Sequence, residues 1–359
     1  MQVMRRRNGI AAAVMLLLIM LLLAQHGAET AAVLRERIML CLRMLIPSLY
    51  GCTAAALLLQ QTGAAALLGR TCRRTARALN MSEEGFAVFA VSQLAGYPVG
   101  ALLLRKIRQR DPRAAEACGQ LSGICFGCGP AFAVGFAGAG LLGDPAAGWM
   151  LYAANILSNL LLAWLTRRKR TIPAGTAHAA EIRFSAAMLP DTAAGTVRSM
   201  AQICGMVLLF GMLLFFAEQI GLTALLVYLG SLAQIPAQVM RALFAAVTDV
   251  TQLTALFRCG LSIRMLLPVT AGMLSFGGIC VHCQCLAAGG GHIRLRNLLG
   301  MRLFAALLTA VFTACITPLL PFPETEAVFS ARAALSASSS PIPALLIFCT
   351  GFPFLLKKD

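Results

Sequence analysis

Charge is scarce in this chain of 359 residues, and acidic residues are the scarcest charged type. There are 14 Asp and Glu against 30 Lys and Arg, and charged residues make up only 12% of the sequence. Hydrophobic residues make up 59%, and the mean hydropathy is +0.79. Several apolar runs approach or exceed the roughly 20 residues that span a bilayer. The sequence therefore predicts an all-α, polytopic membrane protein.

Motifs of the common enzyme classes are absent. The sequence contains no HExxH, no Walker phosphate loop, no GxSxG and no motif of paired carboxylates. The net charge of +16 does not indicate nucleic acid, because no aromatic residues are interleaved with the basic ones. The basic residues form short clusters between apolar segments, which is how membrane proteins set their orientation. We expect no enzymatic activity, no cofactor and no nucleic-acid partner.

The thirteen cysteines do not form the pattern of a secreted disulfide framework, because most of them lie within apolar segments. Two groups are close together in sequence. If they converged in space they would make a soft-metal site for Cu(I) or Zn²⁺. The alternative is that small residues permit close helix packing, and we expect no bound metal. These groups are Cys125 with Cys128, and Cys280, His282, Cys283 and Cys285.

Two neighbouring apolar stretches, 85–104 and 118–142, are interrupted near their centres by Gly96-Tyr97-Pro98 and by Gly127 to Pro130. Interrupted backbone at membrane depth is tolerated only where protein or a water-filled cavity meets it. Transporters use such breaks to turn half-helix ends toward a solute. The second half repeats the pattern with stretches 238–257 and 266–288, the latter broken at Ser275 to Gly278.

The positive-inside rule favours a re-entrant hairpin over a span for 85–104, because the hairpin returns five basic residues to the cytoplasm. We therefore expect about eight transmembrane helices and two re-entrant hairpins in an inverted-topology repeat, with a polar loop at 29–37 before a helix at 38–61. The expected units are an N-terminal transmembrane helix (1–30), a first repeat (31–170), a cytoplasmic linker (171–198), a second repeat (199–320) and a C-terminal transmembrane helix (321–359, with its helix at about 341–356).

Three motifs, SQLAGYPVGA, CGPAFAVGFAGAGLLG and SFGGICVHCQCLA, together resemble the sporulation integral membrane protein YlbJ family, over about residues 45–320. This family belongs to the nucleoside-recognition (Gate) group, whose folds are similar to concentrative nucleoside transporters. The resemblance implies transport of dipicolinate out of the mother cell across the membrane around the forespore. The sequence departs from the family pattern at Leu102, where a Lys is usual, at Phe126-Gly127, where two Asn are usual, and at the tip Asp249 to Leu253, where the first residue is usually Glu.

The predicted site combines these breaks. Asp249 and Thr251 are candidates for a coupling ion, H⁺ or Na⁺, because an acid within an apolar segment is a functional hypothesis by default; the alternative is a solvated outer loop. The candidate substrate-binding residues are Ser92, Gly96, Tyr97, Pro98, Gly100, Gly129, Pro130, Ser275, Gly277, Gly278, His282 and Gln284. For these the alternatives are packing turns, a proline kink and a packed histidine.

Three functions remain open on these observations. The first is a secondary transporter of a dipicolinate-like anion, the second a transporter of nucleoside-like or soft-metal solutes, and the third a non-transporting membrane assembly protein. The lipid bilayer is an expected partner, and the sequence leaves a homo-oligomer open.

Overall fold

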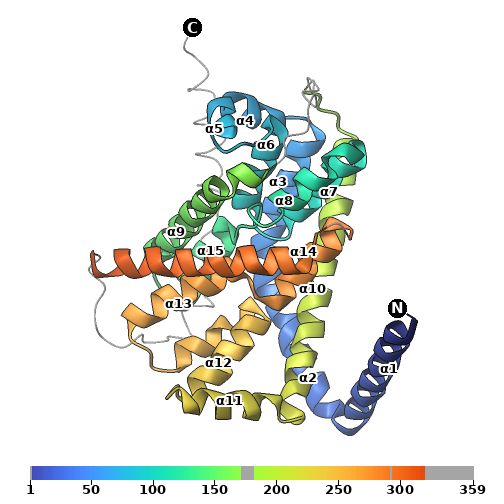
Figure 1. Cartoon of the computed structure of the whole chain (residues 1–359), viewed down its shortest axis with the longest axis vertical. Helices are drawn as coiled ribbons and strands as arrows, with labels where there is room; N and C mark the ends of the chain where they lie inside the picture. The colour runs from blue at the N-terminus through green and yellow to red at the C-terminus, as the bar shows by residue number, and fades with distance from the viewer. Residues whose placement is uncertain (1, 171–181, 292, 320–359) are drawn as a thin grey trace.

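The computed structural model of the chain describes residues 2–170, 182–291 and 293–319 (Figure 1). This part is mainly helical and contains no strand. Five of its helical segments are long and apolar enough to cross a membrane: Gly27–Gln61, Pro145–Leu165, Met188–Gln219, Ile263–Gly289 and Leu295–Ile316. The prediction of an all-α, polytopic membrane protein is confirmed. The expected count of eight spans stays a prediction, and the expected helix at 341–356 lies outside the described residues.

The first half begins with α1 (Gln2–Gln25), which Figure 1 shows standing apart from the rest of the molecule. A continuous helical segment of 35 residues follows, composed of α2, a π-helical turn and α3. The elements between α3 and α9 are shorter. In chain order, the elements of this half after α1 are α2 (Gly27–Leu40), η1 (Cys41–Leu45), α3 (Ile46–Gln61), α4 (Ala65–Thr71), α5 (Arg73–Ala78), α6 (Glu83–Ala95), α7 (Val99–Arg110), η2 (Pro112–Ala114), α8 (Ala115–Leu121), η3 (Ala131–Leu142), α9 (Pro145–Leu165) and η4 (Arg167–Lys169).

The prediction of a polar loop at 29–37 was wrong, because these residues belong to α2. Their sequence, ETAAVLRER, consists mostly of good helix formers and contains no Gly or Pro. Glu29 lies in the first turn of the helix, where a negative charge suits the helix dipole. Polarity at this point therefore marks a helix that extends beyond the apolar run.

The hairpin predicted at 85–104 is present as α6 and α7, which pack against each other. Ser82 accepts a hydrogen bond from the backbone N–H of Gly85 at 3.0 Å and caps the start of α6. Helix α6 ends at Gly96, whose φ of +80° few other residues adopt. The following broken helix consists of α8, a non-helical segment at 126–128 and the π-helix η3.

The second half repeats this order in the opposite direction. In Figure 1, α3 rises to the end where α4 and α5 lie, whereas α10 descends to the end where α11 lies. The second hairpin differs from the prediction in one respect, since its returning arm is a 3₁₀-helix. The elements are α10 (Met188–Gln219), α11 (Leu222–Leu232), α12 (Ala237–Thr248), η5 (Val250–Arg258), α13 (Ile263–Phe276), α14 (Gly278–Gly289), α15 (Leu295–Ile316) and η6 (Thr317–Leu319).

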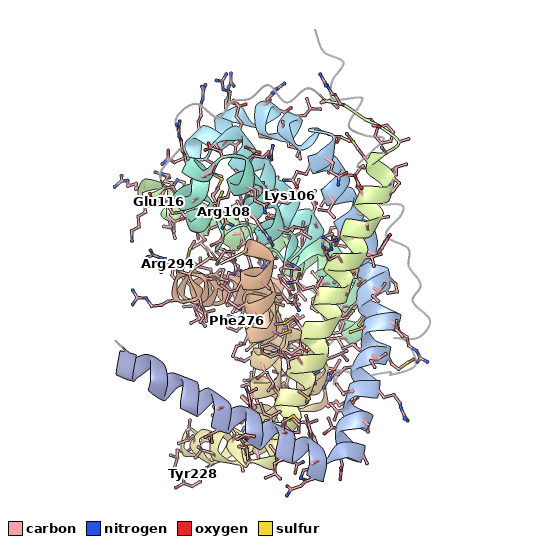
Figure 2. All side chains as sticks on the ribbon, turned by 90° about the vertical axis from the view of Figure 1, so that its right-hand side faces the viewer. Lys106, Arg108, Glu116, Tyr228, Phe276 and Arg294 are labelled. Carbon is pink, nitrogen blue, oxygen red and sulfur yellow. The ribbon has the colours of Figure 1, made fainter. Side chains whose placement is uncertain are left out.

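Two basic side chains of α7 lie toward one end of the molecule. Figure 2 shows Lys106 and Arg108 toward the end that carries α4 and α5, and Tyr228 at the opposite end. Arg108 extends from α7 and donates to the carbonyl oxygens of Gly289 and Gly290, which end α14. The basic end of the first hairpin is thus bound to the end of the second broken helix, and positive charge suits those terminal carbonyls.

Candidate functional site

The breaks of each half meet in pairs. In the first half, the backbone N–H of Tyr97 donates to the carbonyl oxygen of Gly127 at 2.8 Å. Gly96 and Gly129 lie against each other so closely that a Cβ on Gly129 would be 3.1 Å from the Cα of Gly96. In the second half, a Cβ on Gly278 would be 2.9 Å from the backbone nitrogen of Val250. In each half, the tip of the hairpin therefore contacts the break of the following helix.

Phe126 joins the two pairs of breaks. Its ring centroid lies 5.1 Å from that of Tyr97 in the first hairpin and 5.4 Å from that of His282 in the second broken helix. A Cβ on Gly277 would be 2.9 Å from the Phe126 ring. The three breaks that the sequence predicts and the tip of the second hairpin, together called the four breaks below, thus converge on one region of the core.

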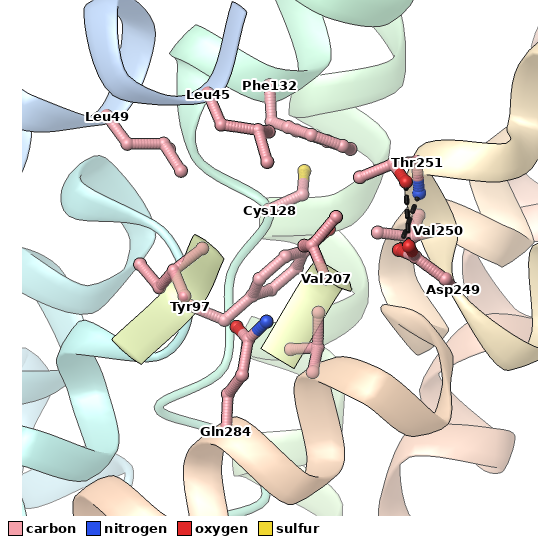
Figure 3. Close-up of a pocket in the computed structure, with 12 residues that line it drawn as sticks. Leu45, Leu49, Tyr97, Cys128, Phe132, Val207, Asp249, Val250, Thr251 and Gln284 are labelled. Carbon is pink, nitrogen blue, oxygen red and sulfur yellow. Dashed lines mark hydrogen bonds between the residues drawn. The ribbon is translucent and has the colours of Figure 1, made fainter. Parts of the chain in front are cut away.

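A cavity of about 20 Å³ lies where these breaks face the long helices (Figure 3). Its volume is on the order of what one water molecule needs, so in this structure it is too small to hold an organic solute. One wall is apolar and comes from α3, the adjoining η1 and α10. The other wall comes from the four breaks and carries both apolar and polar side chains. The lining residues are Leu45, Leu49, Ile203 and Val207 on the first wall, and Tyr97, Cys128, Phe132, Asp249, Val250, Thr251, Val281 and Gln284 on the second.

Asp249 is 2% exposed, so the alternative of a solvated outer loop is excluded for this conformation. Its Oδ1 accepts from the backbone N–H of Thr251 at 3.0 Å, and its Oδ2 accepts from the Thr251 hydroxyl at 2.8 Å. Asp111 and Asp144 make the same turn, each accepting the N–H two residues ahead, but they do so with exposed bonds. Capping a turn therefore does not require a buried carboxylate, and the burial of Asp249 needs another explanation.

The polar groups of the second wall are incompletely satisfied. The Tyr97 side chain is 8% exposed, and its hydroxyl has no hydrogen-bond partner within the described residues. In Figure 3 the amide of Gln284 points toward Tyr97, and its nitrogen donates only to the Cys280 sulfur, at 3.4 Å. Leaving a buried hydroxyl unpaired costs about 1–3 kcal/mol. Tyr97, Gln284 and Asp249 therefore give the cavity donors and acceptors that a solute or ion can use.

The other predicted residues surround the cavity without lining it. The Ser92 hydroxyl donates to the Phe89 carbonyl at 2.7 Å within α6. Nδ1 of His282 lies 2.7 Å from the carbonyl oxygen of Gly278, and its ring packs on Phe126 and Phe276, as expected of a packed histidine. Ser275 bonds to the Arg302 side chain. The remaining predicted residues build the turns and their packing: Gly96, Pro98, Gly100, Gly129, Pro130, Gly277 and Gly278.

Gly100 has a packing role that the motif did not reveal. It faces the segment just before the break at Gly127 to Pro130, and an added Cβ would collide with the carbonyl oxygen of Cys125 and lie 2.9 Å from the Ser92 Cβ. We expect Gly100→Ala to lower the melting temperature of the purified protein markedly, since overpacking against backbone costs about 1–3 kcal/mol or more. Gly135→Ala is the control, because no atom lies within 4 Å of the added Cβ. Equal melting temperatures for the two variants would show that the α7 contact is loose.

A network of buried polar side chains behind the cavity was missed in the sequence. Arg302 in α15 is fully buried and donates to the Asn159 side chain at 2.8 Å, and Asn159 donates to Gln93 at 2.8 Å. The Tyr152 hydroxyl donates to the Gln93 carbonyl at 3.1 Å. One signal was available, because Arg302 is the only charged residue between Asn297 and Ile316. A basic residue near the end of an apolar segment was interpreted as an orientation signal.

The two cysteine groups that the sequence singled out do not combine into a metal site. Within the part of the chain that the structure describes, no group of three or more His, Cys, Asp or Glu side chains is arranged to hold a metal ion. The soft-metal alternative therefore has no structural basis in those residues.

A scan against models of protein families, a search of curated proteins and a search of solved structures each found no match. The function is therefore inferred from the site, and from the motifs given above.

Proposed function

We propose that this protein is a secondary transporter whose solute binds between the apolar wall of α3 and α10 and the wall formed by the four breaks. The observation that carries the proposal is the convergence of both hairpin tips and both broken helices on one cavity that contains a buried carboxylate. Transporters with inverted repeats bind solutes at the repeat interface, at discontinuous helices. Because irregular backbone is expensive within a membrane, its concentration at one point favours a functional origin.

The solute we propose is a small anionic aromatic compound, with dipicolinate as the candidate. The motif resemblance to the YlbJ family supports this choice. The aromatic rings of Tyr97, Phe126 and Phe132 stand close to one another, with centroid distances of 5.1 and 6.2 Å from the Tyr97 ring. Flat aromatic faces suit a flat aromatic solute. The losses of Lys and Asn at Leu102, Phe126 and Gly127 mean that this chain binds its anion with other groups than the family pattern uses.

Asp249 and Thr251 form the proposed coupling site for H⁺ or Na⁺. The carboxylate lines the cavity, so an ion bound there is next to the solute. A cation bound at Asp249 and an anionic solute bound between the two walls would stabilise each other by charge, which links the two binding events. In a spore-forming cell, the proposed location is the mother-cell-derived membrane around the forespore, and the transport direction is out of the mother cell.

Solute exchange in vesicles tests the proposal. Purified protein is reconstituted into vesicles loaded with unlabelled dipicolinate, and entry of labelled dipicolinate is followed. We expect entry much faster than in protein-free vesicles, with inhibition by excess unlabelled dipicolinate and none by uridine. Entry of labelled uridine faster than in protein-free vesicles, without such entry of dipicolinate, would favour the nucleoside-like alternative. Entry no faster than in protein-free vesicles for either solute would favour a membrane assembly protein.

A further inference from the structure

Arg302 carries a buried positive charge that no described acidic side chain neutralises. Among the described residues the charged side chains that are buried are Arg170, Asp249 and Arg302, and no ion pair within the described ranges involves Arg302. Guanidinium groups do not lose their proton in proteins. Buried charges are normally paired, so an unpaired one within a membrane segment is a functional hypothesis by default.

Neutral groups satisfy the hydrogen bonds of this guanidinium without cancelling its charge. Its nitrogens donate to the Ser275 carbonyl oxygen at 2.6 and 3.2 Å and to the Ser275 hydroxyl at 2.8 Å. They also donate to the Gly123 carbonyl at 2.9 Å and to the Asn159 side chain at 2.8 Å. The group is thereby fixed between the two broken helices. All N–H donors of the guanidinium are occupied, so its charge would attract an anion by a longer-range electrostatic interaction and not by a direct hydrogen bond.

The guanidinium is one aromatic ring away from the cavity lining. Its central carbon lies 4.6 Å from the centroid of Phe126, and that ring lies 5.1 Å from the ring of Tyr97, which lines the cavity. The intervening groups are aromatic and buried, so they screen the charge weakly. A unit charge about 10 Å away, through an effective dielectric constant of about 20, changes the affinity for an anion by roughly tenfold.

We propose that Arg302 is the specificity-determining residue that makes the cavity select anionic over neutral solutes. The inference rests on the proposed function. It attributes the preference for a negatively charged solute to a residue that lies outside the motifs. A purely structural role as a clamp between Ser275 and Gly123 requires donors but not a net charge. The two roles therefore differ in one measurable property, the preference between two solutes of the same shape and different charge.

The test compares equilibrium binding of pyridine-2,6-dicarboxylate with that of its neutral diamide on purified protein. The variants are R302K, which keeps the charge, and R302Q and R302M, which remove it. The two neutral variants guard against misfolding, because an apolar side chain of similar volume is often tolerated in place of a buried charge. R296Q is the control, since Arg296 is exposed at the start of the same helix.

We expect the wild type, R296Q and R302K to prefer the dicarboxylate, and the ratio of the two affinities to fall roughly a hundredfold in R302Q and R302M, about tenfold for each of the two carboxylates. Affinity for the diamide should change little. An unchanged ratio in a folded R302Q or R302M, or a ratio lost in folded R302K, would overturn the proposal, as would a wild type that binds neither compound. If neither neutral variant folds, R302K and the wild type decide it. Failure of solute exchange in vesicles with a normal binding ratio would instead refute transport alone.

Discussion

Gly96→Leu should reduce dipicolinate exchange to the level of protein-free vesicles while the protein still inserts. Gly96 has a φ of +80°, and its Cα faces the carbonyl of Cys128, which an added Cβ would approach to 3.3 Å. A leucine would be strained by about 1–2 kcal/mol in this conformation, and its branched end would have to enter the contact between the two breaks. Gly129→Leu should have the same effect, because an added Cβ would lie 3.1 Å from Gly96.

Gly143→Leu is the matched control for conformation. Gly143 has a φ of +67°, but no atom lies within 4 Å of the position of its Cβ. The control bears the same backbone strain without the collision, so it should lose some stability and keep exchange. Exchange that survives in Gly96→Leu and Gly129→Leu, with correct insertion, would show that the paired breaks serve the fold alone.

Asp249→Asn should leave the fold intact and remove the dependence of solute uptake on an H⁺ or Na⁺ gradient. The asparagine oxygen can still accept the Thr251 N–H, because Asn caps helices about as well as Asp. What is lost is the negative charge at the cavity, which attracts the ion. Asp249→Glu should keep part of the coupling, since the charge remains one methylene further out. The measurement is initial uptake with and without each gradient.

Asp144→Asn is the control that distinguishes the loss of charge at the cavity from the loss of a carboxylate that caps a turn. Asp144 accepts the Ala146 N–H at 2.8 Å in the same kind of turn, at the exposed start of α9. This variant should keep the gradient dependence of the wild type. Normal gradient dependence in Asp249→Asn as well would assign Asp249 to capping η5 and would remove it from the coupling mechanism.

The breaks were predictable from the sequence because Gly and Pro act locally. Gly96-Tyr97-Pro98, Gly129-Pro130 and Gly277 end or restart helices at the positions expected from φ and from the missing proline N–H. The burial of Asp249 was also predictable, because this residue is the only acid within a long apolar stretch. The helix at 29–37 was missed because polarity was taken as a loop signal, although propensity alone favours a helix there.

The pairing of the breaks and the role of Arg302 depend on tertiary contacts and could not be predicted. Nothing near Gly96 in the sequence indicates that it faces Gly129, or that Phe126 bridges to His282. The direction in which Arg302 points follows from how α15 packs against α13 and α9, which no local pattern specifies. Gly100 is similar, since its need for a missing Cβ comes from the Cys125 carbonyl 25 residues away in the chain.

The most direct test of the account is concentrative uptake by the wild-type protein in vesicles that contain no dipicolinate at the start. An inward H⁺ or Na⁺ gradient is imposed, and internal labelled dipicolinate is measured over time. The account predicts accumulation above the external concentration, followed by decay to equality when an ionophore collapses the gradient. Internal dipicolinate that never rises faster or higher than in protein-free vesicles, under either gradient, would contradict the account.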